Sequence, residues 1–190
     1  MTQYEFAAEL LKKYEGHDKN WRAGWDVNAW RIGYGSDTIT FDDGTYRKVK
    51  QTDVTNEKNA TKDLVRRVKE FETKVKKKVG AEFWEPLDYQ VKGALISLAY
   101  NYGNITKQAI IDAIKTGNSK KIAEALIKST YNDNKKLSEN VRNALRKRRK
   151  KEADIIAARP NAKKSAGTGG LLKLILIPLI LYGAYTYLKK

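Results

Sequence analysis

The feature that most restricts the fold of this chain is an apolar stripe in its middle third. Apolar residues recur there at intervals of four, four, three, four and four, at Ala60, Leu64, Val68, Phe71, Val75 and Val79. This spacing predicts a long helix that begins near Thr55 and carries these side chains on one face. An apolar helix face requires a partner surface, so this helix has to form part of a packed core.

Further helices are expected on both sides of this stripe. The first helix should end at Gly16, because glycine favours helix C-termini. Pro86 fits the first turn of a central, strongly apolar helix. Two shorter helices are expected over 105–115 and 119–129, and a last one begins at a Ser138 cap. The apolar positions that set these helices are Ala7, Leu10, Leu11, Tyr14, Leu87, Val91, Ala94, Leu95, Leu98, Ala99, Val141, Ala144, Leu145, Ile155 and Ile156.

A strand-like pattern replaces the helical one between about residues 24 and 50. The segments TITF and TYRKV flank the pair Asp43-Gly44, which is a good signal for a β-hairpin. No internal repeat is present. The expected fold class is therefore α+β, with one helix, a small sheet and then a helical lobe.

The composition restricts the chemistry of any active site. The chain has 190 residues, no cysteine and one histidine, His17. Disulfides, thiolate metal sites and cysteine nucleophiles are excluded, and one histidine leaves little room for a histidine-built metal site or a Ser-His-Asp triad. Catalysis would have to depend mainly on carboxylates, and we expect no metal or cofactor.

Positive charge is concentrated toward the C-terminus. Residues 135–190 hold 15 of the 38 Lys and Arg residues but only three of the 22 Asp and Glu residues. Such a basic region predicts an anionic partner: nucleic acid, acidic cell-wall polymer or lipid headgroups. The sequence that follows favours lipid, and nucleic acid is not the expected partner.

The last segment of the chain predicts a membrane anchor. Residues 171–188 are apolar apart from Lys173 and Thr186. Eighteen helical residues reach about 27 Å, close to the hydrocarbon thickness of a bilayer, about 30 Å. A helix buried in the core is the alternative. We expect a globular domain over 1–159, a flexible linker over 160–170 and a transmembrane helix over 171–188; no signal peptide opens the chain.

The stretch WDVNAWRIGYGSDT, residues 25–38, contains two glycines that could indicate a phosphate-binding loop. The dinucleotide motif needs a third glycine where Thr38 stands, and it needs a helix where the hairpin is expected. Phosphate binding is therefore rejected.

One carboxylate before this stretch and one near its start suggest glycoside hydrolysis. Glu15 ends the first helix and Asp26 lies just before the first strand, so the two could face each other across a cleft. Such enzymes use one carboxylic acid to protonate the leaving oxygen and a second carboxylate to activate water or act as nucleophile. Trp21, Trp25 and Trp30 could desolvate the acid and stack on sugars. The alternative is that both acids are ordinary surface residues.

Several motifs in this order resemble the phage-type lysozymes, glycoside hydrolase family 24. The first is Glu15-Gly16, followed by Trp25-Asp26 and then Arg31-Ile-Gly-Tyr-Gly35. Three later segments also resemble the family: TNEKNATKDL, LDYQVKGALISLAYNYGN and NALRKRRKKEADII. Together they span roughly residues 4–157. The resemblance implies a lysozyme-like α+β fold.

The resemblance also implies roles for individual residues. Glu15 takes the position of the general acid and Asp26 that of the second carboxylate, with Asp37 as an alternative. Arg31 stands where the family has threonine, so it would orient Asp26 or bind an acetamido or lactyl group. Ser36 stands where the family has histidine. Other residues expected to support the site or bind substrate are Trp25, Trp30, Tyr34 and Asn101.

The resulting expectation is a membrane-anchored phage lysozyme. It would cleave the β-1,4 bond between N-acetylmuramic acid and N-acetylglucosamine in bacterial peptidoglycan. Its expected place is a virion membrane, beside other virion membrane or capsid proteins, with the host inner membrane as the alternative. Two other functions stay open: an inactive, structural lysozyme fold, and a lytic transglycosylase that uses one catalytic Glu.

Overall fold

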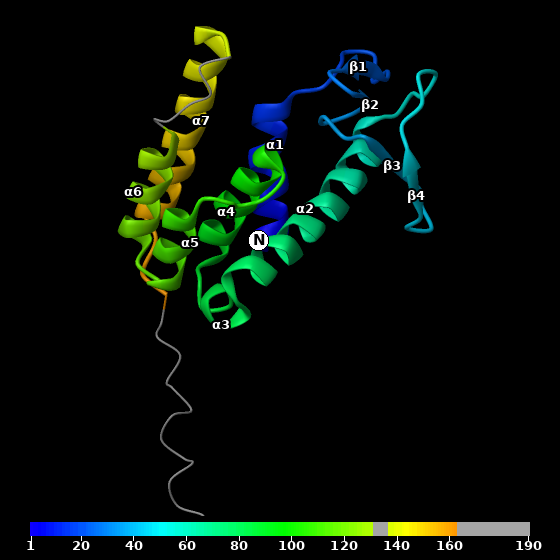
Figure 1. The fold of residues 1–190 in the computed structure, drawn as a ribbon. Coiled ribbons are helices and arrows are strands. Elements are labelled where there is room, and N and C mark those ends of the chain that lie inside the picture. The colour runs from blue at the N-terminus through cyan, green and yellow to red at the C-terminus, as the bar shows by residue number, and fades with distance from the viewer. Residues whose placement is uncertain (131–136, 163–190) are drawn as a thin grey trace, which may run out of the picture.

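A computed structural model describes residues 1–130 and 137–162 (Figure 1). The N-terminal helix α1 (Gln3–Glu15) leads into two short ribbons, which are followed by helices to the end of the described chain. The ribbons are β1 (Gly24–Asp26) with β2 (Ala29–Arg31), and β3 (Thr38–Thr40) with β4 (Tyr46–Lys48). The helices are α2 (Glu57–Val79), α3 (Ala81–Trp84), α4 (Tyr89–Tyr102), α5 (Gln108–Lys115), α6 (Ser119–Thr130) and α7 (Glu139–Ala157).

Helix α4 forms the centre of the helical core. Every residue from Val91 to Ala99 is buried, and the helix contacts α1, α2 and α7. The predicted stripe on α2 is buried from Ala60 to Val79 and covers one side of α4. These two predictions from apolar spacing are confirmed.

Side-chain caps determine where the main helices begin. Thr2 and Glu5 form a reciprocal capping box at α1, and the Asn56 side chain accepts a hydrogen bond from the Asn59 backbone N–H at α2. Ser138 caps α7 as predicted, by accepting from the Val141 N–H. These oxygens satisfy backbone donors that have no partner inside the helix.

Two details of the predicted helices were wrong. Pro86 does not start the central helix; it lies in a turn between α3 and α4, because Asp88 caps α4 by accepting from the Gln90 N–H. Val141 and Ala144 on α7 are exposed, and the buried face of that helix consists largely of charged residues that pair with one another.

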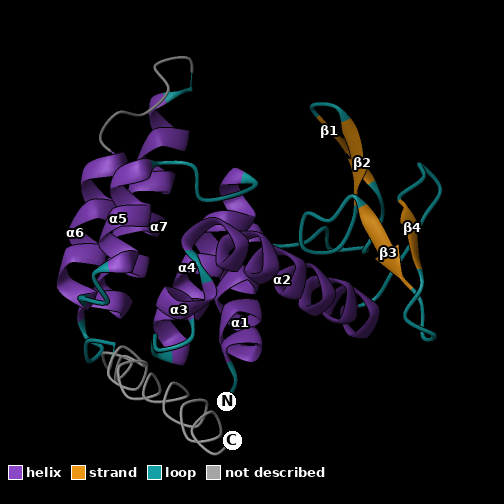
Figure 2. Cartoon of the chain, turned by 60° about the horizontal axis from the view of Figure 1, so that its bottom comes forward, coloured by secondary structure: helices purple, strands orange, loops and turns teal. Residues whose placement is uncertain are grey.

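Residues 17–54 form a small lobe, called here the sheet lobe. The predicted hairpin is confirmed: β3 and β4 are antiparallel, with Ile39 opposite Arg47, and the turn holds Gly44 at φ 86°. A second ribbon pairs Trp25 with Trp30, so Asp26 ends β1 instead of preceding it. Figure 2 shows both ribbons on one side of the molecule, beyond the N-terminal end of α2.

The predicted anchor over 171–188 lies outside the described residues, as does the linker beyond Ala162. Within residues 1–130 and 137–162, no helix combines the length and apolarity needed to cross a bilayer.

Candidate active site

A cleft of about 590 Å³ lies between the C-terminal end of α1 and the β1–β2 ribbon. Glu15, Asp26 and Arg31 all contribute to its wall, so the two predicted carboxylates share one cavity. The lining is completed by Gly16, His17, Asp18, Asn20, Arg22, Ala23, Gly24, Trp25, Ile32, Gly33 and Gly35.

Glu15 is the last residue of α1 and is held from the helical core. Its Oε1 accepts a hydrogen bond of 2.8 Å from Nη1 of Arg148 on α7. The Arg148 guanidinium lies 4.7 Å from the ring centroid of Tyr14, so it is fixed on a second side as well. The other oxygen, Oε2, faces Gly35, where an added Cβ would lie 3.6 Å away. One oxygen is therefore anchored and the other faces the cleft wall.

Arg148 belongs to a buried charged cluster on α7. Its Nε lies 3.3 Å from Oε1 of Glu152, which also accepts from the Ser97 hydroxyl at 2.7 Å. Burial raises the pKa of Glu152, whereas Arg149 and Arg148 lower it in part. Burial likewise lowers the pKa of Arg149, which lies 3.0 Å from Glu152. The contact between Arg148 and Glu15 joins residues far apart in the sequence and was not expected from it.

Asp26 is the exposed carboxylate of the cleft. Its side chain is 63% exposed, and its Oδ2 lies 3.6 Å from Nε of Arg31 on the neighbouring strand. Val27 follows in a left-handed conformation at φ 50°, which is uncommon for a β-branched residue and tightens the ribbon turn. The ion pair places Arg31 directly beside Asp26.

Trp25 and Trp30 stack edge to face across the same ribbon, with ring centroids 5.4 Å apart. Trp25 lines the cleft and is 60% exposed, so its ring can meet a ligand. Trp30 is half-buried and is not part of the cleft lining.

The two glycines of the Ile-Gly-Tyr-Gly run form the cleft floor. Ile32 and Ser36 exchange backbone hydrogen bonds around this turn, with Gly33 at φ 58° and Gly35 at φ 72°. A Cβ on Gly33 would meet the Cβ of Ala60 at 2.8 Å. Glycine is required there because the turn lies directly against α2.

Ser36, a predicted site residue, is buried and is not part of the cleft lining. Its hydroxyl donates to Oδ2 of Asp63 on α2 at 2.5 Å. The hydroxyls of Thr38 and Thr40 reach the other oxygen of Asp63, at 3.2 Å and 2.6 Å. Arg66 completes the set at 3.0 Å. Asp63 was not expected at this site from the sequence, although hydroxyls at 36, 38 and 40 fall on one face of an extended segment.

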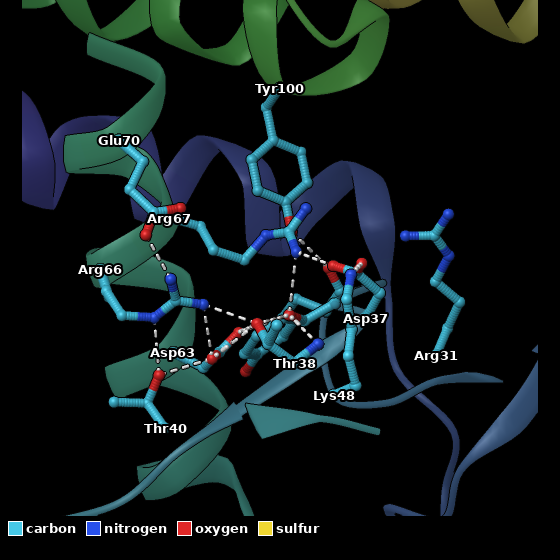
Figure 3. Close-up of polar contacts among 12 residues, drawn as sticks. Arg31, Asp37, Thr38, Thr40, Lys48, Asp63, Arg66, Arg67, Glu70 and Tyr100 are labelled. Atoms are coloured by element: carbon cyan, nitrogen blue, oxygen red, sulfur yellow. Dashed lines mark hydrogen bonds and ion pairs between the residues drawn. The ribbon is translucent and has the colours of Figure 1, made fainter. Parts of the chain in front are cut away.

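Asp37 is placed away from the cleft and is fully paired. It forms ion pairs with Lys48 on β4 and with Arg67 on α2 (Figure 3). Burial by itself would raise the pKa of Asp37, but hydrogen bonds from Lys48 and Arg67 lower it to about 2. A carboxylate held in this way is a poor candidate for the second catalytic group, so Asp37 is not supported in that role.

Two other predicted residues are structural in this arrangement. Tyr34 is buried in the core, and its carbonyl oxygen accepts from the Tyr100 hydroxyl at 3.0 Å. Asn101 accepts a hydrogen bond from Arg149 at 3.4 Å. Neither residue lines the cleft.

His17 also lines the cleft. It is exposed to solvent, and its ring stacks on Trp21 with centroids 3.9 Å apart and nearly parallel planes. Trp21 is in the left-handed region at φ 55° and is held there by backbone hydrogen bonds to Asp18 and Thr55. In the described part of the chain, no three acidic or histidine side chains are grouped as metal ligands would be.

Comparison with known proteins gives a consistent result. The family model for phage lysozyme matches residues 12–152. The fold is similar to that of the endolysin from Escherichia coli O157:H7 phage FAHEc1, with 26% identity, a TM-score of 0.63, and coverage of 86% of this chain and 98% of the endolysin. It is also similar to the muramidase domain of SpmX from Asticaccaulis excentricus, with 20% identity, a TM-score of 0.56, and coverage of 81% and 95%.

A sequence search among curated proteins found no match. The family model nevertheless spans most of the chain and includes both cleft carboxylates, the glycine turn and Arg148. The chain therefore belongs to the phage lysozyme family.

Proposed function

We propose that this protein is a muramidase of glycoside hydrolase family 24. It hydrolyses the β-1,4 bond between N-acetylmuramic acid and N-acetylglucosamine in peptidoglycan. The observation that carries this proposal is that Glu15 and Asp26 line one cleft from opposite sides. Membership of the phage lysozyme family and the likeness to an endolysin support the same substrate.

Glu15 is the general acid in this proposal. Its task is to protonate the glycosidic oxygen as the bond breaks. Arg148 holds Oε1 at 2.8 Å, which fixes the carboxyl group in one orientation and leaves Oε2 for the substrate. A proton donor has to lie within hydrogen-bond reach of the atom that it protonates, so this fixed orientation contributes directly to the rate.

Asp26 activates the attacking water from the other wall. Its exposure gives it access to solvent, and the ion pair with Arg31 keeps the carboxylate directed along the ribbon. Arg31 occupies the position at which the family has threonine. In this chain Arg31 therefore orients the base instead of the water, and its guanidinium is available to a lactyl or acetamido oxygen of the sugar.

The test is an analysis of the products released from purified peptidoglycan. Mass spectrometry separates hydrolysis, which leaves a reducing N-acetylmuramic acid end, from transglycosylation, which leaves a 1,6-anhydro end. We expect reducing ends. The anomeric configuration of the new end, followed by NMR at early times, distinguishes inversion from retention.

A lytic transglycosylase is the second candidate, and the Asp26–Arg31 ion pair favours it. A paired Asp26 would be less available as a base, and a transglycosylase needs only the acid. Predominant 1,6-anhydro products would replace the hydrolase assignment with this one. Absence of either product would favour an inactive, structural lysozyme fold.

We further propose that residues 171–188 anchor the enzyme in a bilayer, with a virion membrane as its first expected place and the host inner membrane as the second. The support is the sequence itself: eighteen residues with a single charge, after a short glycine-containing segment. Such an anchor would confine wall cleavage to the neighbourhood of the membrane.

A further inference from the structure

The point at which the described chain ends is fixed to the helical core. After α7 the chain returns to the turn between α5 and α6, where the Ala162 N–H donates to the Gly117 carbonyl at 2.8 Å. Ser119 adds two hydrogen bonds, from its N–H to Oδ1 of Asn161 at 3.0 Å and from its hydroxyl to the Pro160 carbonyl at 2.9 Å. The C-terminal segment therefore leaves the domain from one defined place.

Basic side chains collect around this exit, on the ends of α2, α5 and α6. Lys115 ends α5 and lies 5.8 Å from the Phe83 ring of α3, so α3 adjoins the exit turn. Six basic residues are involved, of which Arg159 is half-buried and the other five are exposed. The set, called here the exit surface, consists of Lys77, Lys78, Lys115, Lys120, Lys121 and Arg159.

Acidic residues offset part of this charge: Asp112 on α5 and Glu124 on α6 are exposed and lie within one helical turn of Lys115 and Lys120. Glu85 on the same side is paired with Lys76 and Lys92, outside the set. Glu82 on α3 is the exposed acid next to the α2 end. The exit surface thus keeps a net positive charge.

The exit surface and the catalytic cleft lie at opposite ends of the molecule. In Figure 1 the end of α7, α3 and the last turn of α2 are at the bottom, whereas the end of α1 and the β1–β2 ribbon are at the top. Figure 2 brings the lower end toward the viewer, with α3 near α5 and the ribbons beyond the opposite, N-terminal end of α2.

Only the eight residues 163–170 separate the exit from the apolar run that begins at Leu171, and two of them, Lys163 and Lys164, are basic. Eight residues span at most about 29 Å even when fully extended. If the apolar run enters a bilayer, the exit surface has to stay close to the headgroups, whereas the cleft does not.

We propose that the exit surface binds anionic phospholipid headgroups and holds the cleft on the side of the domain away from the bilayer. The inference rests on the proposed anchor for bringing the surface to the membrane, and on the described cations for the contact itself. Each basic residue near an anionic bilayer strengthens its attraction roughly fivefold. Salt shortens the reach of that attraction, from about 8 Å at physiological ionic strength to about 3 Å at 1 M.

The absence of cysteine makes this orientation measurable with single labels on the full-length protein. The variant Asn118→Cys places a fluorophore in the exit turn, and Val27→Cys places one at the 90% exposed ribbon tip beside the cleft. Each labelled protein is reconstituted into vesicles that carry a headgroup nitroxide quencher. The vesicles are phosphatidylcholine alone or phosphatidylcholine mixed with phosphatidylglycerol.

We expect strong quenching at position 118 in the phosphatidylglycerol vesicles, a several-fold loss of it in phosphatidylcholine or at high salt, and little quenching at position 27 in either. Combining Lys115→Glu, Lys120→Glu and Lys121→Glu should abolish the phosphatidylglycerol-dependent part. The matched control is Lys19→Glu, Lys50→Glu and Lys58→Glu, which makes the same change of charge at exposed positions of the sheet lobe and the start of α2. This control should leave the quenching unchanged.

Flotation separates the failure of this inference from the failure of the anchor. Flotation with both kinds of vesicle, but equal quenching at 118 and 27 or no effect of phosphatidylglycerol, would overturn the exit surface and leave the anchor. If the protein floats only with phosphatidylglycerol vesicles and position 118 is quenched, the anchor proposal is overturned and the exit-surface proposal is supported. If the protein floats with neither kind of vesicle, both the anchor and the exit-surface proposals are overturned.

Discussion

Glu15 depends for its orientation on a residue 133 positions further along the chain. Arg148 links Glu15 to Glu152 and Ser97, so the cleft acid is fixed by the same buried cluster that joins α4 to α7. Loss of one partner from such a cluster leaves another charge buried without compensation. The residue that supports the proposed acid is therefore also important for stability.

The variant Arg148→Gln tests this double role. We expect the free energy of unfolding to fall by about 3 kcal/mol, because Glu152 stays buried with fewer partners. We also expect kcat to fall more than the folded fraction does, because Glu15 loses its fixed orientation. Urea denaturation and peptidoglycan hydrolysis are measured at a temperature where the variant is folded. An unchanged kcat per folded molecule would show that Arg148 does not orient the acid.

Asp37 gives the stability of the protein a specific dependence on pH. Its pKa is lowered in the folded state from the usual 3.8 to about 2. The stabilisation is thus complete above about pH 4 and is lost as the pH falls toward 2, with a size of about 2 kcal/mol. The variant Asp37→Asn should be less stable than the wild type by about this amount at pH 7.

The difference in the free energy of unfolding between the wild type and Asp37→Asn should become smaller as the pH falls below 4. Urea denaturation of both proteins across this range is the measurement. A difference that stayed constant down to the lowest pH at which both fold would argue against the ion pairs with Lys48 and Arg67.

At the scale of elements, the sheet lobe is attached to α2 mainly by polar contacts. Of residues 17–54, Tyr34 is the buried member of the continuous apolar core, and Trp21 packs against that core. The β3 hydroxyls instead converge on Asp63, which is 3% exposed. The position of the cleft floor relative to Glu15 therefore depends on polar contacts with α2, among which Asp63 receives the most hydroxyls.

Substitution of that carboxylate should loosen the sheet lobe selectively. In Asp63→Ala, buried hydroxyls and Arg66 lose their acceptor, which should cost about 3 kcal/mol of stability. Hydrogen exchange should become faster in β3 and β4 while α5 and α6 keep their protection. Asp154→Ala, at an exposed acid on α7, serves as the control. A uniform increase in exchange across the whole domain would contradict this view of the lobe.

The elements that the sequence predicted well are those with a local cause. The α2 stripe follows from its period, the β3–β4 hairpin from Asp43-Gly44, and the start of α7 from the Ser138 cap. Glu15 and Asp26 line the same cleft because the C-terminal end of α1 lies beside the β1–β2 ribbon.

Contacts between distant residues could not be predicted in the same way. Ser36 and Asp63 are 27 residues apart in the sequence, and the residues next to each of them do not identify the other as its hydrogen-bond partner. On α7, Ile156 is buried as expected, but Arg148, Arg149 and Glu152 are buried in place of Val141 and Ala144, because mutual ion pairing makes burial of those charges possible. Two signals for the Asp63 contacts were available: an acid at position 63 within the apolar face of α2, and hydroxyls at 36, 38 and 40 on one face of an extended segment.

At the scale of the whole molecule, the two ends have different partners in our account. The cleft end meets the polysaccharide, and the basic end, from which the C-terminal segment leaves, meets the bilayer. Full-length protein should therefore partition into the detergent phase in a detergent phase-separation assay, and a protein truncated after residue 165 should stay in the aqueous phase. Equal partitioning of the full-length and truncated proteins would contradict the proposed anchor.

The central claim is that Glu15 is the acid that cleaves peptidoglycan, and a rate comparison tests it most directly. The release of new saccharide ends from purified peptidoglycan is measured for the wild type, for Glu15→Gln and for Glu9→Gln, a matched change at an exposed position of the same helix. We expect Glu15→Gln to lose activity by at least about 100-fold per folded molecule, measured at a temperature where the variant is folded, and Glu9→Gln to retain full activity. Wild-type rates of peptidoglycan cleavage by Glu15→Gln would show that Glu15 is not the general acid.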